Sequence, residues 1–220
     1  MPKFAQKKTP LYPYSLKEEI ANSVTHGIGA GLSVAGLTLL VALAAIYGDV
    51  WRVVSFSIYG SSLVILYLAS TLYHSFQNPR IKRMLRVLDH ASIYLLIAGS
   101  YTPFLLVSMR DAWGWTLFGV VWGLALLGVV FKVFFIGRYE VVATAAYVLM
   151  GWLCVIAFKE MLVKLPPGGM TFLIIGGVVY TAGVIFYAWE KLPYNHAIWH
   201  LFVLGGSICH FFAVMSLLSL

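Results

Sequence analysis

No Asp, Glu, Lys or Arg occurs in residues 53–79, which read VVSFSIYGSSLVILYLASTLYHSFQNP. A helix of about 20 apolar residues spans the hydrocarbon core of a bilayer. Because lipid offers no hydrogen-bond partner to a free backbone group, we expect this stretch to cross the membrane as a helix. Ser70 and His74, four residues apart near its end, lie on one face of that helix.

Six further uncharged runs cover residues 20–48, 90–109, 112–131, 141–158, 165–189 and 192–220. The alternating pattern of a membrane β-barrel is absent, so helices are expected throughout. We trim the sixth run to begin near Met170, because Pro166-Pro167-Gly168-Gly169 is typical of a turn. The sequence therefore predicts an all-α integral membrane protein with seven transmembrane helices. They form a single domain, 1–220, whose residues 1–19 are a cytoplasmic N-terminal segment.

Composition excludes several other classes of protein. Of the 220 residues, 61% are hydrophobic and 10% are charged, against roughly a quarter charged in an average soluble domain. A soluble enzyme, a disordered protein and a nucleic-acid binder are all excluded on this ground. The net charge of +7 is more typical of cytoplasmic loops than of a nucleic-acid partner.

The distribution of Lys and Arg predicts the orientation. With the N-terminus inside, only four of the 15 fall on the outer side: Arg52, Arg110, Lys159 and Lys164. The positive-inside rule then places the N-terminus in the cytoplasm and the C-terminus outside. The basic N-terminal segment does not lead directly into a short apolar region with a cleavage site, so no removable signal peptide is expected. Ser15 and Glu18 are spaced as a capping box at the start of the first helix.

Ionisable residues within spans are costly and default to functional hypotheses. Seven occur here, namely His26, His74, Asp89, His90, His196, His200 and His210. At about 1.5 Å of rise per residue, all but His90 and His210 are expected at depths of roughly 5–14 Å below the inner surface. His210 falls near the opposite leaflet and is interpreted as a packing or interfacial residue.

Spacing favours a metal site among these residues. His196 and His200 project from one face of a helix, which is half of a zinc site, and His74 at matching depth supplies a third ligand. Three imidazoles leave one coordination position for water, as in catalytic zinc sites. Asp89 could then orient that water or accept its proton, and Ser70 could hydrogen-bond to it.

Structural interpretations remain open for each of these residues. A His-x-x-x-His pair is often packing or interhelical hydrogen bonding, and Ser commonly bonds its own helix backbone. Asp89 could be an interfacial residue paired with Arg83 or Arg86. His90 points about 100° away from Asp89 around the helix and is interpreted as structural.

Three motifs together resemble those of the hemolysin III proteins, bacterial relatives of the progestin and adipoQ receptors. They are Glu19-x-x-Asn22-x-x-x-His26, Ser70-x-x-x-His74 with Asp89 following, and His196-x-x-x-His200. The segments SLKEEIANSVTHGIG, LASTLYHSF, LDHASIYLLIAGSYTPF and PYNHAIWH are similar to the bacterial inner-membrane branch. The resemblance covers the chain from residue 15 to the last helix.

This resemblance implies a seven-helix protein of the bacterial inner membrane with a Zn²⁺ site near the cytoplasmic face. The ligands would be His74, His196 and His200, with Ser70 and Asp89 as the water-associated pair. Glu19, Asn22 and His26 match the first motif and are assigned to a supporting shell.

Several functions remain open. The wider superfamily includes alkaline ceramidases, so the resemblance implies a zinc-dependent lipid amidase or hydrolase that acts on an acylated membrane lipid. The alternative is a receptor or regulator of membrane homeostasis in which zinc only ties helices together. A cytolysin ranks below both, because no helix carries a continuous polar stripe, and a transporter would need ionisable groups deeper in the membrane or on both sides.

Overall fold

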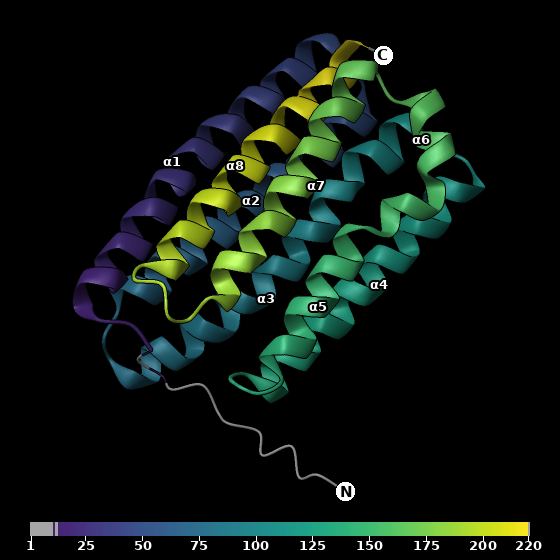
Figure 1. Ribbon diagram of the computed structural model, residues 1–220. Coiled ribbons are helices and arrows are strands. Elements are labelled where there is room, and N and C mark those ends of the chain that lie inside the picture. The colour runs from purple at the N-terminus through teal and green to yellow at the C-terminus, as the bar shows by residue number, and fades with distance from the viewer. Residues whose placement is uncertain (1–10, 12, 220) are drawn as a thin grey trace, which may run out of the picture.

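The computed structural model describes residue 11 and residues 13–219, and this part of the chain contains helices and no strands (Figure 1). The α-helices are α1 (Leu16–Tyr47), α2 (Val50–Ser75), α3 (Pro79–Pro103), α4 (Ala112–Phe135), α5 (Glu140–Gly151), α6 (Phe158–Lys164), α7 (Pro167–Ala188) and α8 (Asn195–Met215). Short turns of other helix types are η1 (Phe104–Ser108), η2 (Leu153–Ala157) and η3 (Ser216–Ser219). Seven segments are long and apolar enough to cross a membrane, as predicted.

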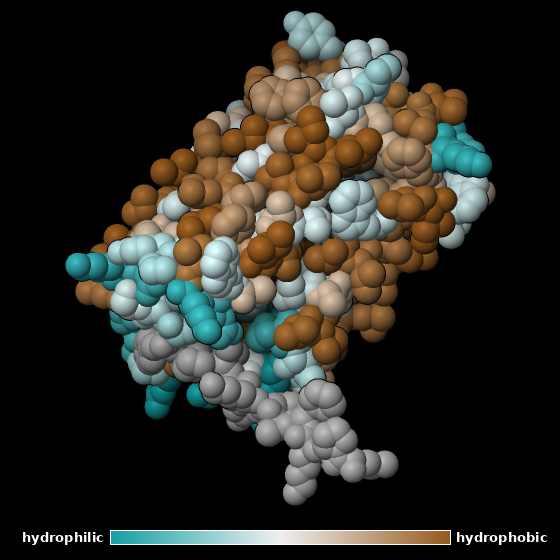
Figure 2. Space-filling view, viewed as in Figure 1, coloured by the Kyte–Doolittle hydropathy of each residue, from teal (hydrophilic) through white to brown (hydrophobic). Residues whose placement is uncertain are grey.

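The helices lie side by side in one bundle, with the beginning of α1 and the end of α8 at opposite ends (Figure 1). The spans of α2 and α3 are the most buried of the seven. Outward-facing side chains such as Leu127, Val163 and Ile185 are exposed. Figure 2 shows the consequence on one face, where a broad hydrophobic body carries hydrophilic residues mainly at the end where α1 begins. Such a surface is suited to lipid.

Side-chain caps mark where the helices begin. Ser15 and Glu18 form the predicted capping box of α1. The side chains of Asp49, Asn78 and Asp111 accept hydrogen bonds from backbone N–H groups in the first turns of α2, α3 and α4. Each cap satisfies a backbone donor that has no partner within its own helix. The short connections therefore contain the polar residues that stop one span and start the next.

The expected start of the sixth span near Met170 is wrong, because α7 already begins at Pro167. Proline is favoured at the first helical position, where its ring fixes φ and its missing N–H costs nothing. The Pro-Pro-Gly-Gly sequence is thus partly the first turn of the helix and not only a connection.

The fifth span is not one continuous helix. It changes from α5 to η2 at Gly151–Trp152 and continues as α6. The Tyr101 hydroxyl of α3 donates to the carbonyl oxygen of Gly151 at 2.7 Å and accepts from the N–H of Cys154 at 2.9 Å. Because unpaired backbone groups are costly in an apolar interior, Tyr101 stabilises this break.

Candidate metal centre

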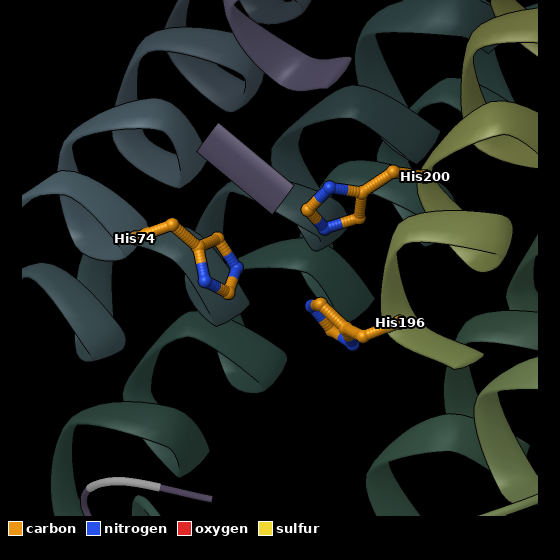
Figure 3. Close-up of side chains that lie close together, drawn as sticks. All are labelled: His74, His196 and His200. Atoms are coloured by element: carbon orange, nitrogen blue, oxygen red, sulfur yellow. The ribbon is translucent and has the colours of Figure 1, made fainter. Parts of the chain in front are cut away.

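Three histidines converge from opposite sides of the bundle, His74 from α2 and His196 and His200 from α8 (Figure 3). One nitrogen of each ring lies within 4.8 Å of the corresponding nitrogens of the other two. The ring of His74 lies 5.1 Å from that of His196 and 5.2 Å from that of His200. The expected convergence of these imidazoles is therefore present, and it joins residues more than one hundred positions apart in the chain.

The start of α8 is fixed immediately before the first of these ligand candidates. Tyr194 has left-handed backbone angles (φ 57°), which are uncommon for a residue with a side chain. Its N–H donates to Glu18 at 3.2 Å, and the side chain of Asn195 donates to the carbonyl oxygens of Phe186 and Tyr187 at the end of α7. These bonds hold the first turn of α8, and His196 with it, against α1 and α7.

A buried carboxylate orients His74. Oε2 of Glu19 lies 2.6 Å from Nδ1 of His74, and Oε1 of Glu19 lies 2.9 Å from Nζ of Lys82. Both side chains of the Glu19–Lys82 pair are almost completely buried. Because a carboxylate only accepts hydrogen bonds, Nδ1 of His74 donates to Glu19, and Nε2 is the ring nitrogen left to bind a cation.

His200 is oriented in the same way by a backbone group. Its Nδ1 lies 3.1 Å from the carbonyl oxygen of Asn22 and 3.1 Å from the hydroxyl of Thr25. The carbonyl oxygen of Asn22 accepts a hydrogen bond from Nδ1–H of His200. Nε2 of His200 is therefore free to bind a cation. His26 stacks on His200 with ring centroids 3.4 Å apart, and both of its nitrogens are buried without a hydrogen bond. The first motif thus contacts the other two through Glu19, Asn22 and His26.

The residues present suit a divalent metal ion. Nε2 of His74 and Nδ1 of His196 are buried and have no hydrogen-bond partner. An unpaired buried acceptor is costly, and a cation would satisfy these lone pairs. Three imidazole nitrogens with carboxylate and backbone partners behind them match the ligands and supporting bonds of many zinc sites.

Asp89 and Ser70 lie beside this cluster. Asp89 lines an apolar cavity of about 210 Å³ together with His26, His90, His196 and His200. The hydroxyl of Ser70 is buried close to the Asp89 carboxylate, and its oxygen has no hydrogen-bond partner. A carboxylate at the wall of the cavity can accept a proton from a group bound there.

His90 contacts a different group of charged side chains, Glu140 and its partner Lys132. Its Nδ1 lies 3.6 Å from Glu140, whose carboxylate pairs with the fully buried Lys132 at 2.6 Å. His90 also accepts a hydrogen bond from Tyr147 through its backbone carbonyl at 2.8 Å. These contacts support a structural role for His90, although its ring also reaches the cavity. His210 lies at a different level of the cavity, against the ring of Tyr180 at 5.2 Å.

Tyr14 covers the cluster from the N-terminal side. Its ring lies 4.9 Å from the ring of His196 and 6.1 Å from that of His74. Burial, together with the nearby Tyr187, Tyr73 and Glu19, raises the pKa of the Tyr14 phenol, so the group stays neutral. It can therefore donate a hydrogen bond at this face of the site.

Sequence reasoning missed two contributors to this centre. Tyr14 precedes the first span, and Lys82 resembles an ordinary cytoplasmic charge in the sequence although it is fully buried. Outside this centre, Lys132 likewise resembles an ordinary cytoplasmic charge in the sequence and is fully buried. An ion pair between distant helices leaves no local pattern, although Lys82 lies only one helical turn from Asn78, the cap of α3.

Comparison with known proteins assigns the family. The model of the family "Haemolysin-III related" matches residues 14–211. The chain belongs to the hemolysin III family. It is 50% identical to Hemolysin-3 of Bacillus cereus over 200 residues, which cover 91% of both chains. Identity to the Hemolysin-3 homolog of Bacillus subtilis (strain 168) is also 50%, over 202 residues that cover 92% of this chain and 95% of that one.

A similarity extends to a human protein. The chain is 28% identical to the Homo sapiens monocyte to macrophage differentiation factor over 209 residues, which cover 92% of this chain and 85% of that protein. In this hemolysin III family member, the range matched by the family model includes the three histidines of the candidate metal centre and all the residues that orient them.

Proposed function

We propose that this hemolysin III protein is a zinc-dependent hydrolase that cleaves an amide or ester bond of an acylated lipid. We place it in the bacterial inner membrane, with its site near the cytoplasmic face. One observation carries the proposal: of three converging imidazoles, those of His196 and His200 line an apolar cavity whose wall also bears the Asp89 carboxylate. An apolar pocket with a few convergent polar groups is the usual form of a small-molecule site.

Each residue has a distinct part in this proposal. His74, His196 and His200 would hold zinc, which when bound supplies a Lewis acid and activates water at neutral pH. Asp89 would accept the proton released during attack and return it to the leaving group, and Ser70 would orient Asp89. The apolar wall, with Ile93, Leu96 and Val203 among its side chains, would bind an acyl chain and exclude bulk water.

The proposal is tested with purified, zinc-loaded protein and a panel of N-acyl and O-acyl lipids. Release of fatty acid by the wild type should be lost in Asp89→Asn, while the zinc content of the two proteins stays equal. Asp111→Asn is the matched control, because Asp111 is a helix cap outside the bundle interior. Stoichiometric zinc without hydrolysis of any lipid in the panel would contradict a hydrolase.

A regulator with a structural metal is the second candidate. It is favoured by the ion pair of Glu19 with Lys82, which joins α1 to α3 directly behind His74. In that case His74→Ala should lower the melting temperature strongly, and no hydrolysis would exist to be lost. Lysis is suggested only by the names of the family and of its two Bacillus relatives, and leakage from vesicles in the same preparation would test it.

A further inference from the structure

A second pocket lies outside the histidine site, where the first turns of α3 approach the connection between α4 and α5. It encloses about 400 Å³ and is lined by Arg83 and Arg86 of α3 and by Arg138 of the connection. The side chains of Arg83 and Arg138 are exposed, whereas Arg86 is mostly buried. Three arginines therefore line one small volume.

The charge around this pocket is predominantly positive. Glu140 lies 3.9 Å from Arg86, but its other carboxylate oxygen is bound by Lys132 at 2.6 Å. One carboxylate is thus shared between two buried cations and cannot neutralise all three arginines of the pocket. Guanidinium groups bind phosphate oxygens in pairs, with better geometry than ammonium groups.

The backbone of the connection holds Arg138 in place. Gly137 has a left-handed backbone (φ 74°), and its N–H donates to Glu140 at 3.1 Å. The N–H of Arg138 donates to the carbonyl oxygen of Phe135 at 2.9 Å. The turn is therefore closed by its own hydrogen bonds, which fix the backbone of Arg138 relative to the end of α4 and the start of α5.

The rest of the pocket wall is apolar. Leu11, Phe134 and Ile136 line it, and Phe134 is 75% exposed at the rim of the bundle. A soluble anion would gain nothing from such neighbours, whereas a phospholipid presents a phosphate and acyl chains together. We propose that this pocket binds the phosphate of an anionic phospholipid, whose acyl chains lie against Phe134. Basic pockets between transmembrane helices bind such head groups in other membrane proteins.

The test compares matched double variants of the full chain, purified in a neutral detergent. Arg83→Gln/Arg138→Gln removes two arginines of the pocket. Arg80→Gln/Lys191→Gln removes two exposed cations that do not line it. Binding of phosphatidylglycerol and of phosphatidylcholine is measured by native mass spectrometry. The pocket variant should lose affinity for phosphatidylglycerol by about tenfold or more, and the control variant should change by less than twofold.

A charge-preserving variant separates lost binding from lost folding. Arg83→Lys/Arg138→Lys keeps both positive charges and should retain part of the affinity for phosphatidylglycerol. If the pocket variant and the Arg80→Gln/Lys191→Gln control lose equal affinity for phosphatidylglycerol, the lipid is held by general attraction to surface charge. That result would overturn the proposal. Displacement of the lipid by millimolar inorganic phosphate, or equal binding of phosphatidylcholine, would overturn it as well.

Discussion

Glu19 of α1 accepts a hydrogen bond from Nδ1 of His74 of α2 at 2.6 Å, across a separation of 55 residues in the sequence. The same carboxylate pairs with Lys82 of α3 at 2.9 Å. Three helices are thereby joined at one buried group, directly behind a residue that faces the candidate metal position. A carboxylate behind a ligand histidine fixes its tautomer and raises its basicity.

Glu19→Gln should therefore weaken metal binding by about 10- to 100-fold. The amide has no charge with which to polarise His74. Competition with a chelator of known affinity measures the effect, and the control is Glu160→Gln on α6, whose side chain is 42% exposed and pairs with Lys164.

Loss of Glu19 also leaves Lys82 buried without its carboxylate, which costs about 3–5 kcal/mol of stability. The double variant Glu19→Gln/Lys82→Met removes both charges and should recover much of that stability while metal binding stays weak. Wild-type affinity in either variant would show that Glu19 does not act through His74.

Substitution of any one of the three converging histidines by Ala should abolish stoichiometric metal. Two imidazoles alone do not complete a zinc site, in which at least three protein ligands are usual. Elemental analysis of purified His74→Ala, His196→Ala and His200→Ala measures this. His210→Ala is the matched control, since that ring lies against Tyr180 and away from the cluster. A metal-free wild type would refute the centre itself.

Tyr14→Ala should speed the release of metal to a chelator without changing the metal content at equilibrium in excess metal. The ring of Tyr14 covers His196 and His74. Contacts between aromatic rings are worth about 0.5–1.5 kcal/mol, so an increase of about two- to tenfold in the rate is expected. Tyr47→Ala, at an exposed position at the end of α1, should leave the rate unchanged. Identical rates in the two variants would contradict a covering role for Tyr14.

Tyr101→Phe should lower the free energy of unfolding by about 1–3 kcal/mol, because the Gly151 carbonyl and the Cys154 N–H lose their shared partner. Thermal unfolding in detergent measures the change. The metal content should stay at the wild-type level, since Tyr101 lies at the break in the fifth span. Unchanged thermal stability would mean that another group supports the break.

The number of spans follows from the sequence, because hydrophobic length acts locally, and so does the start of α1, which its capping box marks. His196 and His200 share a face for the same reason, since helical periodicity alone decides it. The predicted start of α7 is wrong because a proline can begin a helix as readily as it can interrupt one.

Only the tertiary structure decided which groups from different parts of the chain meet around the candidate metal centre and beside it. The pairing of Glu19 with Lys82, the cover provided by Tyr14 and the pairing of Lys132 with Glu140 all join different helices or connections. Their charges look like ordinary loop or interface charges in the sequence. Their burial results from the way α1, α3 and α4 pack, and helix packing depends on side chains from several spans at once.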